Sequence, residues 1–261
     1  MPRFAPFMLT AMALLSAGCG DSGSPTSNPQ VNFNLATRAA PASAAGAALS
    51  VTTPESFTDG TNTLVLNQVD LVLREIELRR SEVTISCGES PSDDACEKLE
   101  LGPILLNLPL GVGAARAFSV TVPPGTYDEV AFEIHRPSSS DDAAFIQANP
   151  DFDGVSIHVS GTFNGTPFDF VSDLNSEEEI SLNPPLTITE TAATDLTLFV
   201  NLDTWFRDAA GSLIDPATAA KGQANEDVVK ENIRRTLDAF EDNNRDGEDD
   251  HGGVDDGPNH T

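Results

Sequence analysis

Apolar and polar residues alternate with a period of two through most of the chain between about Asn62 and Phe206. Successive side chains of a strand point to opposite faces, so this period predicts strands with one buried face. The alternating apolar positions are Val69, Leu71 and Leu73; Phe118, Val120 and Val122; Val130, Phe132 and Ile134; Val155, Ile157, Val159 and Phe163; Phe168 and Phe170; Ile180 and Leu182; Leu186 and Ile188; and Leu196, Leu198, Val200 and Leu202. Seven or more short strands, no interleaved helices and frequent Pro and Gly turns predict a mainly β protein, an antiparallel β-sandwich, over residues 51–206.

Two local signals add detail to this sandwich. The apolar phase slips after Leu73 to Ile76 and Leu78, which predicts a β-bulge near Arg74-Glu75. Farther along, Asn164-Gly165 separates two alternating runs. Because both positions of a tight hairpin turn need a positive φ, this dipeptide predicts a β-hairpin.

The period changes near the C-terminus, after a predicted linker over residues 207–222. One face of a helix is outlined by apolar residues at helical spacing, namely Val229, Ile233, Leu237 and Phe240. Asn225 can cap the start of this helix, and Glu226 and Asp227 suit the positive end of its dipole. We predict an amphipathic helix over residues 223–241 that docks on the sandwich; the alternative is a helix that binds a partner.

The first residues have the pattern of an export signal. A basic start at Arg3 is followed by an apolar run, Phe4 to Leu15, that is too short to span a bilayer, and then by Ala17-Gly18-Cys19. This resembles a bacterial lipoprotein signal, with Ser16 where the usual leucine stands. We therefore expect residues 1–18 to be removed and Cys19 to carry lipid such as palmitate. The alternative is an ordinary signal peptide that contains a cysteine.

Residues 19–50 are predicted to be a flexible tether, because bulky apolar residues are scarce there. Val31, Phe33 and Leu35 are the exception and alternate as one possible strand. No apolar run after residue 19 approaches the roughly 20 residues of a membrane helix. Any membrane attachment is therefore expected through lipid, in the bacterial cell envelope and at the outer membrane rather than the inner one.

The chain is strongly acidic, with 41 Asp and Glu against 14 Lys and Arg. This charge repels nucleic acid phosphates and anionic lipid surfaces, so neither is an expected partner. It favours cations.

Cys87 and Cys96 flank a polar, turn-rich segment. An exported chain meets an oxidising compartment, so these two cysteines are predicted to form a disulfide. A metal site is the alternative, but no second pair of Cys or His stands at ligand spacing.

The segment after the predicted helix resembles the start of an EF-hand calcium loop. Oxygen-bearing side chains stand at its first, third and fifth positions, glycine at the sixth and an acid at the ninth. The predicted ligands are Asp242, Asn244, Asp246, the backbone carbonyl of Glu248, and Asp250. The twelfth position is Gly253 where an EF-hand needs a bidentate Glu, so we expect weak calcium affinity, with Asp255, Asp256 or water completing the shell. The alternative is a solvated acidic tail over residues 242–261.

Catalytic motifs are absent from the sequence: it has no Gly-x-Ser-x-Gly elbow, no His-Glu-x-x-His and no phosphate-binding glycine loop. His135 and His158 take the polar phase of their strands, so both are expected at the solvated surface. Trp205 is expected to fill the core beneath the C-terminal helix rather than to form a sugar platform.

Three segments resemble a family of bacterial exported lipoproteins whose shared β-sandwich domain is a domain of unknown function. They run from Val69 to Leu78, from Pro123 to Tyr127 and from Leu196 to Leu202. The resemblance covers roughly residues 60–206, implies an immunoglobulin-like or prealbumin-like sandwich and supplies no catalytic residues. We expect a lipid-anchored, non-enzymatic binding or structural module that meets an unidentified envelope or extracellular ligand. The alternative is an envelope or extracellular hydrolase whose catalytic residues are not identified.

Overall fold

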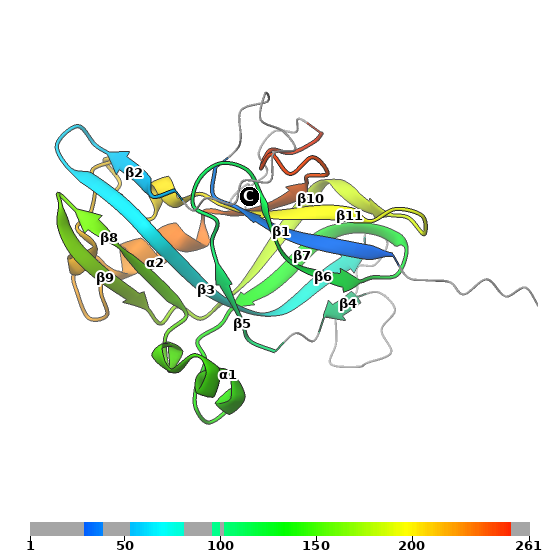
Figure 1. Ribbon diagram of the computed structural model, residues 1–261, viewed down its shortest axis with the longest axis horizontal. Coiled ribbons are helices and arrows are strands. Elements are labelled where there is room, and N and C mark those ends of the chain that lie inside the picture. The colour runs from blue at the N-terminus through cyan, green and yellow to red at the C-terminus, as the bar shows by residue number, and fades with distance from the viewer. Residues whose placement is uncertain (1–28, 39–52, 81–95, 100–101, 252–261) are drawn as a thin grey trace, which may run out of the picture.

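The long strand β3 (Thr63–Arg80) organises the larger of two β-sheets in the computed structural model (Figure 1). The structure describes residues 29–38, 53–80, 96–99 and 102–251. The larger sheet has the order β10-β7-β3-β8-β9, with three short strands also paired to β3. Its other strands are β2 (Glu55–Thr58), β4 (Cys96–Leu99), β5 (Ile104–Asn107), β7 (Gly125–Ile134), β8 (Ile157–Phe163), β9 (Thr166–Ser172) and β10 (Ser176–Ile188).

The smaller sheet, which we call sheet A, has the order β12-β11-β1-β6 and packs against the larger one. Its strands are β1 (Gln30–Ala36), β6 (Ala115–Thr121), β11 (Thr194–Val200) and β12 (Leu237–Glu241). The helical elements are α1 (Ala143–Ala148), α2 (Glu226–Arg234) and the 3-10 turns η2 (Pro150–Phe152), η3 (Leu202–Thr204) and η4 (Pro216–Thr218). The mainly β, sandwich-like class predicted from the alternation is confirmed.

Both local signals are confirmed. The pairing of β3 with β7 shifts register between Arg74 and Glu77, and Glu75 has a φ of 52°. An extra residue in one strand explains why the apolar phase slips there. Asn164 and Gly165 form the two-residue turn between β8 and β9, with φ values of 50° and 80°.

The N-terminal boundary of the sandwich was predicted wrongly. Residues 19–50 were expected to be a tether, but β1 lies inside sheet A, parallel to β11 and antiparallel to β6. The parallel pair also means that the sandwich is not wholly antiparallel. Val31, Phe33 and Leu35 face the core as an apolar row, as their alternation suggested. The intervening polar residues Asn32 and Asn34 are buried as well, which the polar character of the segment concealed.

The C-terminal helix is shorter than predicted. Val229 and Ile233 are buried, so α2 does dock through its apolar face, but it ends at Arg234. Leu237 begins β12, which pairs antiparallel with β11. Leu237 and Ala239 are both buried, as alternate residues of a strand are. Leu237 also stands four residues after Ile233, which is a helical spacing, and for this reason the helix was predicted to continue. Residues 207–222 were expected to be a linker, yet they carry η4 and a bridge between Arg207 and Leu213.

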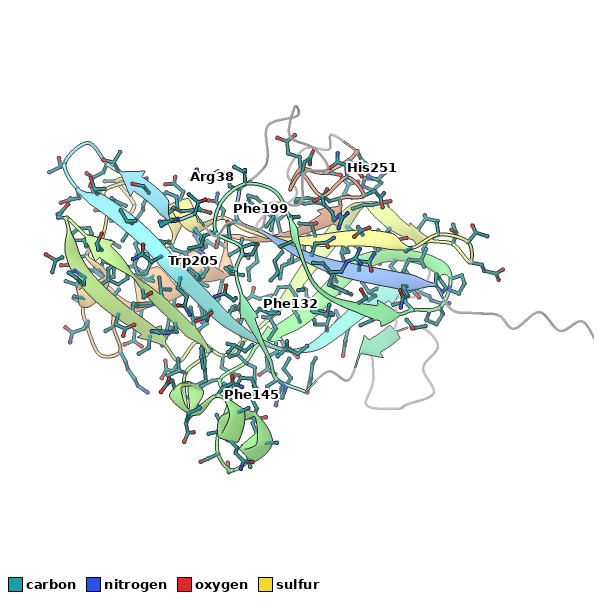
Figure 2. All side chains as sticks on the ribbon, viewed as in Figure 1. Arg38, Phe132, Phe145, Phe199, Trp205 and His251 are labelled. Carbon is teal, nitrogen blue, oxygen red and sulfur yellow. The ribbon has the colours of Figure 1, made fainter. Side chains whose placement is uncertain are left out.

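Trp205 fills the interior beneath α2, as predicted (Figure 2). Its side chain is fully buried, and the indole Nε1 donates to Oγ1 of Thr236 at 2.8 Å. The Nδ2 group of Asn232, on α2, donates to the Trp205 carbonyl oxygen at 3.1 Å. These hydrogen bonds attach α2 to the sandwich.

Cys19 and Cys87 lie outside the described residues, as does the side chain of Cys96 at the start of β4. Lipidation and the disulfide therefore stay predictions. Among the described residues, no helix is long and apolar enough to cross a membrane.

Candidate metal centre

The loop from Asp242 to Asp250, which we call the acidic loop, follows β12 directly and curls back on itself. The Asp250 amide donates to the Glu241 carbonyl oxygen at 3.1 Å, and the Asn243 amide donates to Oδ2 of Asp250 at 2.7 Å. The ninth position of the predicted calcium loop thus returns to its beginning. A cation loop needs this closure, because ligands that are apart in sequence must converge on one point.

Three predicted ligand side chains turn toward the backbone of the acidic loop. Asp242 Oδ1 and Asn244 Oδ1 both accept from the Asp246 amide, at 3.1 and 2.8 Å, and Asp246 Oδ1 accepts from the Glu248 amide at 2.9 Å. Gly247, at the sixth position, has a φ of 82°, the conformation for which a glycine was expected there. The spacing of the motif therefore has a structural basis even before any ion is considered.

Burial divides the predicted ligands into two groups. Asp242 is fully buried and Asp246 is 7% exposed, whereas Asn244, Glu248 and Asp250 are exposed. Burial raises the pKa of the Asp242 carboxyl, although hydrogen bonds from the Thr197 hydroxyl at 2.9 Å and the Gly247 amide at 3.0 Å favour its charged form. A carboxylate that has lost its hydration is stabilised by a nearby cation.

The acidic loop is fixed to the outer face of sheet A. Leu196 and Leu198 of β11 point between the two sheets, so Thr197 points outward, where its hydroxyl meets Asp242. The Asp242 amide donates to the Asp195 carbonyl oxygen at 3.1 Å. Sequence reasoning missed Thr197, because a threonine in a strand carries no signal of a site.

Carboxylates alone do not form a metal cage here. Among the side chains that the structure describes, no three of His, Cys, Asp or Glu gather as a group that could hold a metal ion. A cation in the acidic loop would need amide and backbone carbonyl oxygens as well, which are ligands that calcium accepts.

His135 was predicted wrongly to be solvated. It is buried, and its Nε2 lies 2.9 Å from Oδ2 of Asp142, in the segment that carries α1. The Ser138 amide donates to the same Asp142 oxygen at 3.0 Å, so this segment folds back onto His135, just after the end of β7. His158 is half-buried and paired with the exposed Asp169. Neither histidine contacts the acidic loop.

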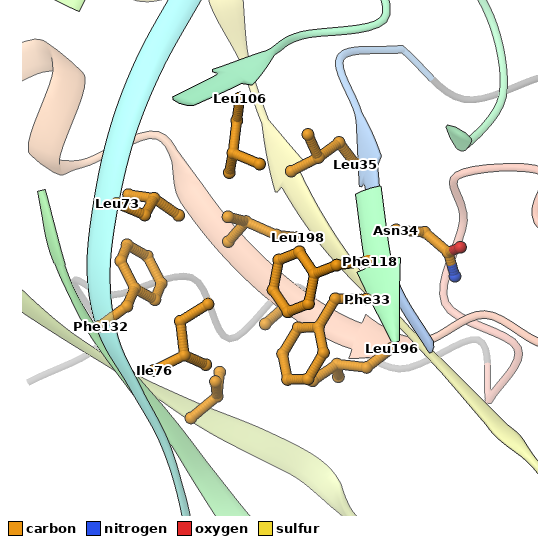
Figure 3. A pocket seen from close by; sticks show the side chains of 12 residues that line it. Phe33, Asn34, Leu35, Leu73, Ile76, Leu106, Phe118, Phe132, Leu196 and Leu198 are labelled. Carbon is orange, nitrogen blue, oxygen red and sulfur yellow. The ribbon is translucent and has the colours of Figure 1, made fainter. Parts of the chain in front are cut away.

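A small apolar pocket lies between the two sheets (Figure 3). Its walls include Leu73 and Phe132 from the larger sheet and Phe33, Phe118 and Leu198 from sheet A. The pocket holds about 20 Å³, which is room for about one water molecule. This gap in the core is too small for an organic ligand.

Comparison with known proteins adds little to the description of this chain. No family model matches the chain, and no curated protein matches it. Among solved structures, MbnP from Methylosinus trichosporium aligns over 69% of this chain and 78% of its own, with a TM-score of 0.37 and 10% identity. This likeness is too low to support an inference about function. The molecule is therefore defined by its own features, as a two-sheet β protein with an acidic loop on the outer face of sheet A.

Proposed function

We propose that this protein is a lipid-anchored protein of the bacterial cell envelope that acts as a non-enzymatic binding or structural module. We propose further that the acidic loop binds calcium and thereby holds the end of β12 against its neighbour β11. The anchor rests on the Ala17-Gly18-Cys19 motif after a short apolar run. The same proposal places the anchor in the outer membrane and has the sandwich bind an envelope or extracellular ligand.

The observation that best supports calcium binding is the burial of the Asp242 carboxylate. It is fully buried, it stands at the first position of the calcium-type spacing, and Asp246 is buried with it. Two buried acids in one loop repel each other, and a divalent cation between them removes that repulsion. Calcium fits better than magnesium, because a loop built from side-chain and backbone oxygens lacks the strict octahedral geometry that magnesium demands.

Affinity for calcium should be weak, on the order of 10⁻⁴–10⁻³ M, as in extracellular modules. Gly253 stands at the position that supplies the bidentate ligand of an EF-hand. A site in this range is filled outside the cytoplasm, where calcium is abundant, and bound calcium then stabilises the folded form by mass action.

Calorimetric titration of the full chain with calcium tests the loop. We expect one site in the wild type, none in Asp242→Asn, and a melting temperature that rises with calcium only in the wild type. Glu190→Gln is the matched control, since it removes one acidic charge at an exposed turn outside the acidic loop. Millimolar calcium that changes neither heat nor melting temperature would mean that the segment is only a solvated acidic end.

The anchor is tested separately. Mass spectrometry of the mature protein should find an acylated N-terminus at Cys19, and Cys19→Ala should move the protein to the soluble fraction. A mature, lipid-free chain that begins beyond Cys19 would contradict the anchor without touching the calcium proposal.

A further inference from the structure

We propose that Asn34 of β1 supplies its side-chain carbonyl oxygen as a ligand to the cation in the acidic loop. The inference rests on the proposed calcium site and adds a ligand from the opposite end of the described chain. It accounts for an oxygen that the twelve-residue motif itself lacks at Gly253.

Asn34 lies on the outer face of sheet A. Phe33 and Leu35 point between the sheets, and Figure 3 shows the Asn34 side chain directed away from these apolar residues. Asn34 pairs in register with Thr197, whose hydroxyl contacts Asp242 at 2.9 Å. It is nevertheless fully buried, as Asp242 is.

Asn34 is held through its nitrogen. Its Nδ2 group donates to Oδ1 of Asp195 at 3.1 Å, and a carboxylate cannot donate, so the amide orientation is fixed with Oδ1 on the other side. The same Asp195 is bonded to the start of the acidic loop, since its amide donates to Oδ1 of Asn243 at 3.4 Å and its carbonyl oxygen accepts from the Asp242 amide. Asn34 thus shares two neighbours, Asp195 and Thr197, with the loop.

The Oδ1 atom of Asn34 is buried and has no hydrogen-bond partner among the described residues. Buried acceptors are nearly always satisfied, so one without a donor needs an explanation. Arg116, the register partner of Asn34 on β6, contacts Oδ1 of Asp195 at 3.4 Å but makes no hydrogen bond to the Asn34 oxygen. The nearby carboxylates of Asp195 and Asp242 are oxygen ligands of the kind that a hard cation requires. An amide oxygen is a normal calcium ligand and adds no charge to a loop that already buries Asp242 and Asp246.

A buried water could satisfy the same oxygen, and the two explanations differ in measurable ways. Asn32 is the matched control: it is two residues away on the same face and nearly as buried, but its Oδ1 already accepts from the Ser119 hydroxyl at 2.8 Å. Replacing Asn32 by alanine should disturb the packing of β1 without removing a ligand of the ion.

The experiment compares wild type, Asn34→Ala, Asn34→Asp and Asn32→Ala in the full chain. Calcium affinity is measured by calorimetry, and the number of waters on the ion is measured from europium(III) luminescence lifetimes in light and heavy water. Asn34→Ala should lower the calcium affinity by about tenfold or more and add about one water to the bound ion. Asn34→Asp should tighten it, because added ligand charge raises affinity. Asn32→Ala should match the wild type.

Three outcomes would overturn the inference, and they can be told apart. If Asn34→Ala binds calcium with wild-type affinity and hydration, Asn34 is no ligand while the loop site stands. If the wild type binds no calcium, the proposed site fails and Asn34 with it. If Asn34→Ala is unfolded in chelator, the test rests on Asn34→Asp. Calcium affinity and a number of bound waters equal to those of the wild type in that variant would show that Asn34 does not coordinate the ion.

Discussion

Lys230 of α2 donates to Oδ1 of Asp173 at 2.6 Å and ties the helix to the segment that follows β9. Lys221 contacts the other carboxylate oxygen at 2.5 Å, and Glu226 holds Lys230 from within the helix at 2.6 Å. The hydrogen bonds from Lys221 and Lys230 lower the pKa of Asp173 to about 2. The docking of α2 on the sandwich therefore depends on a charge as well as on Val229 and Ile233.

Asp173→Asn should lower the free energy of unfolding by about 1 kcal/mol at pH 7, the upper end for partly exposed ion pairs. The pKa of Asp173 is lower in the folded state than in the unfolded state, so its contribution is present at neutral pH. It is lost as the pH falls from the ordinary carboxyl range through about 2. Urea unfolding across this range should show the variant and wild type converging in acid. Glu190→Gln, at an exposed turn, is the control and should unfold with the same free energy as the wild type at each pH.

Glu178→Gln should stabilise the protein at pH 7 by about 1 kcal/mol, because the wild type buries a carboxyl whose Oε1 has no hydrogen-bond partner among the residues that the structure describes. Burial raises the pKa of Glu178. Stability tied to this group is therefore full below the ordinary carboxyl pKa and is lost as the pH rises through the raised value. Thermal melts should show a gain at pH 7 that disappears near pH 4. Glu177→Gln, exposed on the opposite face, should show no such gain; an equal gain there would point to net charge instead.

The acidic loop should make stability depend on pH only when calcium is absent. Burial raises the pKa of Asp242, so in chelator the folded state should lose stability as the pH rises above the carboxyl range. Calcium should offset that loss, since it neutralises the charge that burial disfavours. Melting temperatures from pH 4 to 8, with chelator and with millimolar calcium, should diverge toward high pH. Parallel curves would contradict the prediction.

Thr236→Val should cost about 1–3 kcal/mol, because the buried Trp205 Nε1 would lose its acceptor. Thr236→Ser keeps the hydroxyl and should cost less. The two variants are compared by urea unfolding with the fluorescence of Trp205, the single tryptophan in the chain. Equal stabilities would show that this hydrogen bond contributes nothing.

Features that depend on neighbouring residues were predictable from the sequence. The Asn164-Gly165 turn and the bulge at Glu75 each follow from backbone conformations that a few adjacent residues decide. The alternation that defines β3 and β11 follows from burial of one face, which needs no knowledge of the partner strand.

Features that depend on distant pairing were not predictable. Val31, Phe33 and Leu35 indicated a possible strand, but its place inside sheet A was not predicted, because the outward residues Asn32 and Asn34 are polar and only the fold shows that they are buried. Leu237 fitted a helix and a strand equally, and its pairing with Val200 decides for the strand. His135 looked solvated because the segment that covers it lies outside its own strand. Asn34 carries no signal of a site until β1 and the acidic loop are brought together.

The place of β1 has a mechanical consequence if Cys19 is anchored. Ten residues lie between Cys19 and the start of β1 at Gln30, so the sheet would stay within about 40 Å of the lipid. A pull on the anchor would be applied to a strand held on both sides, by β11 and by β6. Drawing β1 out along its length would shear two ladders of hydrogen bonds together, whereas an edge strand can be peeled away one bond at a time. A lipid at Cys19 would therefore attach the domain at a position suited to bear tension.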